Sequence, residues 1–128
     1  MNERYVIDAY AWIEYLIGSK AGENVKSVLE EDNEIYTCAA TLAEVISKTA
    51  REGRNFEVAY DILVSNSQII NVDEEVSKEA GVLHSETRKT KHDFGLADAY
   101  VLAVARRMKS KVLTSDVHFK GVKEAILI

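Results

Sequence analysis

The sequence predicts an α/β protein built as a three-layer α/β/α sandwich around a central, mainly parallel sheet. Short apolar runs rich in β-branched residues alternate with longer stretches in which apolar residues recur every three or four positions, the patterns of strands and amphipathic helices. Strands separated by helices pair in parallel through right-handed crossovers, which place helices on both faces of a sheet. The chain is predicted to form one domain, spanning residues 1–128.

The predicted elements follow one another without a linker or a repeat. Strands are expected at residues 5–7, 34–38, 68–72, 111–114 and 125–128. Helices are expected at residues 9–17, 22–31, 41–52, 56–64, 74–88 and 96–108. Gly18 is a stop signal for the first helix, and the helix at 96–108 is the most apolar. The large aromatic Trp12 is expected to be buried, whereas Tyr10 is expected to line a groove or a dimer face.

The charge of the chain is divided unevenly. The formal net charge of −5 argues at first sight against a nucleic-acid partner. Residues 1–86 hold 17 acids and 7 bases, a balance of −10, whereas residues 87–128 hold 4 acids and 9 bases, a balance of +5. The C-terminal bases lie in short clusters, typical either of solvated helix ends or of a nucleic-acid surface. An acid-rich metal site explains part of the overall acidity.

Two features concern the compartment. No apolar run approaches the roughly 18 residues of a membrane helix, and Met1-Asn2-Glu3-Arg4 leads into the first strand without a signal-peptide pattern. The single cysteine, Cys38, cannot form a disulfide within the chain or a zinc site alone. We therefore expect a cytoplasmic protein with no membrane association.

Four acidic residues lie where strands end or helices begin. Asp8 directly follows the first strand, and Asp116 follows the strand at 111–114 after one intervening residue. Glu44 falls in the first turn of the helix at 41–52, and Asp98 lies near the start of the helix at 96–108. In a doubly wound sheet these positions share the carboxyl edge, where ligands bind at the point of strand-order reversal. We therefore expect the four carboxylates to converge on one crevice.

Each acid also has an ordinary structural role open to it. Asp8 fits a helix N-cap and Asp116 the start of a turn. Thr41 and Glu44 have the spacing of a capping box. Asp98 is favourable at a helix N-terminus, yet it enters an apolar stretch with no Arg or Lys one turn away. Because an unpaired buried carboxylate is costly, a metal ion is the expected partner of Asp98.

Converging carboxylates favour a particular kind of ligand. Their repulsion is strong in a low-dielectric crevice, and a divalent cation removes it. Oxygen ligands with neither His nor Cys among them favour Mg²⁺ or Mn²⁺ over zinc. Such ions polarise phosphate and activate water, so the constellation suits hydrolysis of a phosphodiester.

Four segments, in this order, resemble the PIN domain family and, within it, the short VapC-type toxin ribonucleases of prokaryotic toxin–antitoxin pairs. They are Val6-Ile7-Asp8, Thr41-Leu42-Ala43-Glu44-Val45, Leu96-Ala97-Asp98-Ala99 and Val112-Leu113-Thr114-Ser115-Asp116-Val117-His118-Phe119. The resemblance covers essentially the whole chain, and its specificity comes from the four segments together. The family often has Ser, Thr or Asn one or two positions after its first Asp, where this chain has Ala9 and Tyr10.

The resemblance implies an α/β/α fold and a metal-dependent endoribonuclease. Its acidic cluster, catalytic and metal-binding, would be Asp8, Glu44, Asp98 and Asp116. Thr114 would place a supporting hydroxyl beside the last acid. The resemblance also implies homodimerisation and a small antitoxin that inserts a segment into the active-site groove. Because Ala9 and Tyr10 depart from the family pattern, we do not expect a hydroxyl or amide group at these positions to assist the first carboxylate.

The remaining candidates are weaker. The histidines His84, His92 and His118 have no metal-binding spacing, and His118 fits a turn better than a substrate contact. Four basic residues are candidates for contacts with an RNA backbone, and their positions are equally typical of solvated helix ends. They are Arg51, Arg88, Lys89 and Lys91. Single-stranded or looped RNA is the expected target, because sequence-specific readers favour unpaired bases.

Three other classes of protein are alternatives to a PIN-type ribonuclease. A 5′-nuclease-like DNA hydrolase would need duplex-binding elements for which 128 residues leave no room. A receiver-like phosphoacceptor would show a cluster of acids after the first strand, where Asp8 stands alone. A non-catalytic PIN-like module that binds RNA or protein is the main alternative. It would be favoured by the loss of one of the four acids, and all four are present.

Overall fold

The computed structural model describes residues 3–128; Met1 and Asn2, which precede the first predicted strand, lie outside the described residues. Five strands form one sheet in the order β3-β2-β1-β4-β5, and every neighbouring pair is parallel. The strands are β1 Arg4–Ile7, β2 Glu34–Cys38, β3 Gln68–Ile70, β4 Lys111–Thr114 and β5 Ala125–Leu127. The predicted parallel sheet is confirmed.

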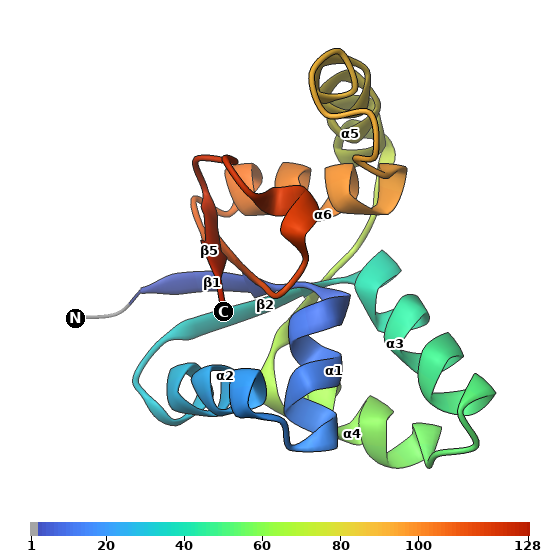
Figure 1. Cartoon of the computed structure of the whole chain (residues 1–128), viewed down its shortest axis with the longest axis vertical. Helices are drawn as coiled ribbons and strands as arrows, with labels where there is room; N and C mark the ends of the chain where they lie inside the picture. The colour runs from blue at the N-terminus through green and yellow to red at the C-terminus, as the bar shows by residue number, and fades with distance from the viewer. Residues whose placement is uncertain (1–2) are drawn as a thin grey trace.

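Helices cover both faces of this sheet. They are α1 Ala9–Ile17, α2 Lys20–Glu30, α3 Ala39–Arg51, α4 Phe56–Asn66, α5 Glu74–Thr87, α6 Leu96–Arg107 and the 3-10 helix η1 Val117–Phe119. Helices α1 to α4 lie on one side of the sheet, and α5 and α6 lie on the other (Figure 1). The predicted three-layer α/β/α sandwich is therefore confirmed. Within residues 3–128, no helix is both long enough and apolar enough to cross a membrane.

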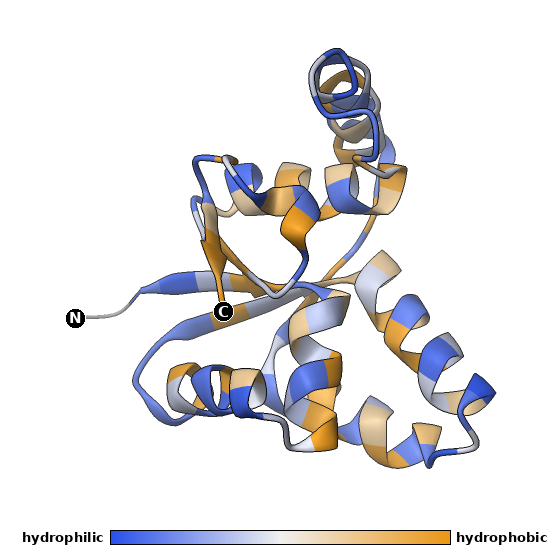
Figure 2. Cartoon of the chain, in the orientation of Figure 1, coloured by the Kyte–Doolittle hydropathy of each residue, from blue (hydrophilic) through white to orange (hydrophobic). Residues whose placement is uncertain are grey.

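Adjacent residues of β1 contribute to two separate cores. Val6 packs with residues of α5 and α6, whereas Ile7 packs with Trp12 of α1 and Val45 of α3. Successive side chains of a strand point to opposite faces, so β1 is buried on both sides, as expected for a parallel sheet. The helices carry hydrophilic and hydrophobic residues in short alternation, as amphipathic helices do (Figure 2).

Helix α2 begins two residues before its predicted start. Ser19 caps it by accepting a hydrogen bond from the Gly22 N–H at 3.1 Å, so Gly22 lies inside the helix. A Cβ at Gly22 would lie 2.3 Å from the carbonyl oxygen of Glu14 in α1. Gly18, with a φ of 71°, ends α1 in the left-handed region as predicted. Two glycines thus permit a tight α1–α2 pair.

Helix α3 also begins earlier than predicted, at Ala39. Thr41 therefore lies inside the helix, and its buried hydroxyl has no hydrogen-bond partner in the part of the chain that the structure describes. The capping box considered for Thr41 and Glu44 is wrong. Glu44 lies in the second turn of α3 and not in the first.

The order in which the chain adds strands to the sheet reverses between β1 and β4. The chain adds β2 and β3 on one side of β1, then crosses back through α5 and α6 to add β4 and β5 on the other. Such a reversal opens a crevice beyond the carboxyl ends of the two central strands. Asp8 follows β1 at this edge and Asp116 follows β4.

Candidate functional site

Asp8 connects the end of β1 to the start of α1. Its backbone N–H donates to the carbonyl of Leu113 in β4 at 3.2 Å. Its Oδ1 accepts the Ala11 N–H at 2.9 Å and so caps α1, the structural role considered for it. Its Oδ2 accepts a hydrogen bond from the Thr114 hydroxyl. These bonds hold a carboxylate that is only 3% exposed at the crevice end of the sheet.

Thr114 joins the first acid to the last. Its hydroxyl donates to Asp8 and accepts the backbone N–H of Asp116 at 2.8 Å. Asp116 then caps η1, because its Oδ1 accepts the His118 N–H at 2.9 Å. The turn-initiating role considered for Asp116 is thus observed. One buried hydroxyl fixes the separation of the two acids that follow β1 and β4.

Asp98 reaches the same crevice from the first turn of α6. Its Oδ2 accepts the Gly95 N–H at 2.9 Å, and its side chain is 18% exposed. Its partners within the protein are this backbone amide and the imidazole of His118, whose Nδ1 lies 4.0 Å from Oδ2. Both hold Asp98 close to Asp116. The expected metal partner of Asp98 stays a prediction.

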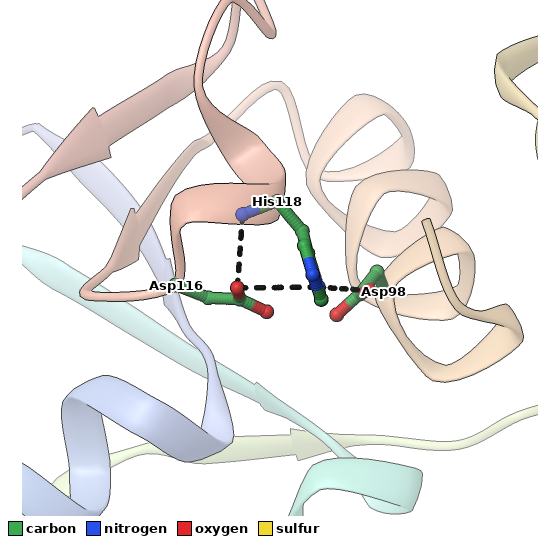
Figure 3. A group of neighbouring side chains, drawn as sticks. All are labelled: Asp98, Asp116 and His118. Carbon is green, nitrogen blue, oxygen red and sulfur yellow. Dashed lines mark hydrogen bonds and ion pairs between the residues drawn. The ribbon is translucent and has the colours of Figure 1, made fainter. Parts of the chain in front are cut away.

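His118 completes the cluster, and the sequence gives little sign of it. The short helix η1 turns its imidazole between the two carboxylates, with Nδ1 3.3 Å from Asp116 Oδ1 (Figure 3). Asp98, Asp116 and His118 offer ligand atoms that all lie within 4.8 Å of one another. The sequence indicates only a turn residue here. The one usable signal is the position two residues after Asp116, which a single 3-10 turn brings back over the acid.

Glu44 is the outlying member of the predicted set. It lies on an exposed part of α3. Neither Glu44 nor Asp8 belongs to the group whose ligand atoms lie within 4.8 Å of one another, but Asp8 is joined to Asp116 through Thr114. The pKa of the Glu44 carboxyl is nevertheless raised, first by partial desolvation and then by repulsion from Asp98. The structure brings Asp8, Asp98 and Asp116 together and leaves Glu44 at the edge.

The environment of these acids opposes their ionisation. Burial raises the pKa of Asp8 to about 7; repulsion from Asp116 and Asp98 adds to this effect, and two hydrogen bonds oppose it. Burial likewise raises the pKa of Asp98, again with a contribution from Asp116. The pKa of the Tyr10 phenol is raised first by Asp116, and all the other predicted acids contribute. The crevice therefore has an excess of negative charge.

The residues at this site fit a divalent cation. In residues 3–128, the ion pairs that involve Asp98 and Asp116 are those with His118, and neither Lys nor Arg pairs with them or with Asp8. Carboxylate oxygens are the ligands that Mg²⁺ and Mn²⁺ prefer, and the ion would offset their repulsion. Sequence reasoning expected oxygen ligands alone; the structure adds the nitrogen of His118 to the potential ligand atoms that lie near one another.

A groove with a volume of about 1150 Å³ runs between α1 and α3 from Glu44 and Tyr10. Its lining residues are Ala9, Tyr10, Ile13, Glu14, Ile17, Ala43, Glu44, Ser47, Lys48, Arg51, Glu52 and Arg54. Tyr10 thus lines a groove, one of the two positions expected for it. Trp12 is fully buried as predicted, and its Nε1–H donates to Thr37 Oγ1 at 3.1 Å.

The four predicted RNA-contacting bases fall in two places. Arg51 lines the groove, while the other three lie at the C-terminal end of α5 and just beyond it, outside the lining. Lys89 pairs with Glu86 at 3.3 Å, and the Lys91 ammonium donates to the carbonyl of Lys120. Arg88 is exposed. Only Arg51 among the four borders the groove, whose lining also includes Glu44.

Comparison with known proteins identifies a family. The family model described as PIN domain matches residues 5–125. No curated protein matches the chain in sequence.

Solved structures share the fold at low sequence identity. A chain of a toxin–antitoxin complex from Klebsiella pneumoniae aligns with a TM-score of 0.75 at 20% identity, covering 95% of each chain. A chain of VapBC2 from Rickettsia felis, bound to a promoter DNA fragment, aligns with a TM-score of 0.74 at 19% identity, covering 98% of this chain and 97% of that one. VapC20 from Mycobacterium tuberculosis, described as a toxin that cleaves the Sarcin-Ricin loop, aligns with a TM-score of 0.74 at 16% identity, covering 94% and 95%.

Proposed function

This chain belongs to the PIN domain family, and we propose that it is a cytoplasmic, metal-dependent endoribonuclease, the toxin of a type II toxin–antitoxin pair. The observation that carries the proposal is the convergence of Asp8, Asp98 and Asp116 at the carboxyl ends of β1 and β4. The similarity to VapC20, described as a toxin that cleaves the Sarcin-Ricin loop, supports the choice of RNA as substrate. The similarity to the toxin–antitoxin complex from Klebsiella pneumoniae supports the role of toxin.

In this proposal Asp8, Asp98 and Asp116 hold Mg²⁺ or Mn²⁺, and Glu44 acts from the edge of the crevice. A bound divalent ion supplies Lewis acidity toward a phosphate oxygen and makes water more acidic. The protein supplies the placement: Thr114 holds Asp8 and the Asp116 backbone, and Gly95 holds Asp98. Such preorganised ligands need little rearrangement when a phosphodiester arrives.

The groove between α1 and α3 is the proposed path of the RNA. Arg51, Lys48 and Arg54 line it and would contact phosphates, while the exposed ring of Tyr10 offers a surface on which an unpaired base can stack. The bases beyond α5 are weaker candidates, because they lie outside the lining of this groove. A single-stranded or looped target suits this arrangement, because unpaired bases expose their faces.

The same groove is the proposed site of a small antitoxin. Ile13 and Ile17 give it an apolar floor, and the bases at its rim suit an acidic segment. An inserted segment would block the path to the acids and so inhibit cleavage. The chain is also proposed to act as a homodimer, which light scattering of the purified protein would test.

The test is cleavage of a mixed pool of single-stranded RNA, with and without Mg²⁺ or Mn²⁺. Wild type is compared with Asp98→Asn, which keeps the size of the side chain and the bond from Gly95. Asp61→Asn, an exposed acid on α4, is the matched control. We expect wild type and the control to cut, EDTA to abolish cutting, and Asp98→Asn to reduce the rate by about 10²-fold or more.

The outcomes separate the alternatives. Equal cutting by all three proteins would show that the activity is a contaminant and that the acids do not act. Failure of wild type both to cut RNA and to bind either ion in calorimetry would favour the non-catalytic binding module. Co-purification of a small protein that blocks cutting would support the antitoxin, whereas unrestrained growth of cells that express the chain alone would contradict the toxin.

A further inference from the structure

His118 gives the proposed metal site a nitrogen ligand in addition to its carboxylates. Its Nδ1 lies 3.3 Å from Asp116 Oδ1 and 4.0 Å from Asp98 Oδ2, and the ring points into the space between the two carboxylates (Figure 3). The three residues come from two separate segments, the start of α6 and the turn after β4. Their arrangement therefore depends on the tertiary fold and not on the spacing of a local motif.

The separations suit ligands of one small ion. Around an octahedral ion with bonds of about 2.1 Å, adjacent ligand atoms lie about 3.0 Å apart and opposite ones about 4.2 Å apart. The distances from His118 Nδ1 to Asp116 Oδ1, 3.3 Å, and to Asp98 Oδ2, 4.0 Å, both fall between these limits. A charge-assisted hydrogen bond between His and a carboxylate is shorter, at roughly 2.7–2.9 Å. The spacing is therefore compatible with shared coordination of one ion.

The fold holds the imidazole in this direction. The backbone N–H of His118 donates to Asp116 Oδ1 at 2.9 Å, which fixes the turn at its start. The next residue, Phe119, is fully buried and packs edge-on against Phe94, with ring centroids 5.5 Å apart. Phe94 itself lies in the loop that leads into α6 and Asp98. One aromatic contact therefore ties the position of His118 to that of Asp98.

We propose that His118 is a direct metal ligand and that the resulting mixed nitrogen and oxygen site prefers Mn²⁺, and transition metals generally, over Mg²⁺. This inference rests on the proposed function, because it concerns the metal of the same site. Imidazole is a softer donor than carboxylate and gains more from a transition metal than from Mg²⁺, which prefers oxygen ligands and retains its waters. Carboxylates alone would bind either ion. The nitrogen donor makes the difference.

The test is pulsed electron paramagnetic resonance of Mn²⁺ bound to the intact protein, which detects a directly bound nitrogen through its hyperfine coupling. Wild type should show this coupling, and ¹⁵N labelling should shift it. His118→Gln, which puts an amide in place of the imidazole, should lose it. The matched control is His84→Gln, because His84 influences Asp98 electrostatically from α5 but does not belong to the cluster.

Affinities give a second readout that does not depend on catalysis. Calorimetric titration should show Mn²⁺ binding weakened by about tenfold or more in His118→Gln, with little change for Mg²⁺ and none in His84→Gln. Bound Mn²⁺ without nitrogen coupling in wild type would overturn the role of His118 and leave the proposed function standing. Absence of Mn²⁺ and Mg²⁺ binding by wild type would overturn the proposed function itself.

Discussion

The buried carboxyl of Asp8 should make the metal-free protein lose stability as the pH rises. Its pKa is raised to about 7 in the folded chain, from an ordinary value of 3.8. Between these values the folded protein holds a proton that the unfolded chain has released, so protonation favours folding. The stabilisation is fully present below about pH 4 and is lost as the pH passes through about 7. The substitution Asp8→Asn removes this dependence, because an amide does not ionise there.

The size of the effect follows from the shift. One pKa unit corresponds to about 1.4 kcal/mol, and about two units separate pH 5 from the folded pKa. Wild type should therefore lose about 2–3 kcal/mol between pH 5 and pH 8 that the variant keeps. No large discount for solvent applies, because Asp8 is only 3% exposed. For a domain of this size that difference corresponds to roughly 10 °C in melting temperature.

The assay is urea unfolding of wild type and Asp8→Asn at pH 5 and pH 8, both with EDTA. Asn can accept the Ala11 N–H as Asp8 does, so the cap of α1 is retained. Titration of Glu44 and Asp98 affects both proteins and largely cancels in the comparison. Parallel pH dependences for the two proteins would refute the reasoning, because they would show that Asp8 ionises in the fold as readily as in the unfolded chain.

Three further predictions concern packing and placement. Gly22→Ala should destabilise the protein by about 1–3 kcal/mol, measured by urea unfolding, because the added Cβ would lie 2.3 Å from the Glu14 carbonyl oxygen. Unchanged stability would show that α1 and α2 can move apart at no cost. Thr37→Val should cost about 1–3 kcal/mol and alter the fluorescence of Trp12, the single tryptophan, whose buried N–H loses its acceptor. Thr114→Val should weaken Mn²⁺ binding by about 10–100-fold with the fold retained, since its hydroxyl orients two of the acids, and unaltered affinity would remove that role.

The architecture could be predicted because each element has a strong local pattern. The sheet is parallel because helices separate its first four strands, and the apolar run around Val6 and Ile7 reflects burial on both faces. The errors lie at the ends of elements: β3 ends at Ile70 and not at Val72, α4 continues to Asn66, and two helices start early. Helices α2 and α3 begin earlier than the hydrophobic periodicity indicates, after the N-cap residues Ser19 and Cys38. The position of an N-cap depends on local backbone geometry, which the periodicity does not report.

The site could be predicted only in part, for a physical reason. Asp8 and Asp116 follow adjacent strands, so topology alone brings them together. The direction of the Glu44 side chain depends on the exact phase of α3, and a start two residues earlier than expected moves it to the second turn and the edge of the crevice. The inward direction of the His118 side chain depends on η1 and on the burial of Phe119. A helix of three residues is too short to show a hydrophobic periodicity in the sequence, so neither feature could be predicted.

The structural and functional roles weighed for the acids turn out to be compatible. Asp8 and Asp116 cap helices, and Asp98 accepts a backbone N–H in the first turn of α6. Helix N-termini lie at the carboxyl edge of a parallel sheet, and their partial positive charge offsets some repulsion between carboxylates gathered there. Capping uses one oxygen of each carboxylate to fix its direction. The fold therefore assembles a negatively charged crevice from residues that also begin its helices, and the proposed cation would complete the arrangement.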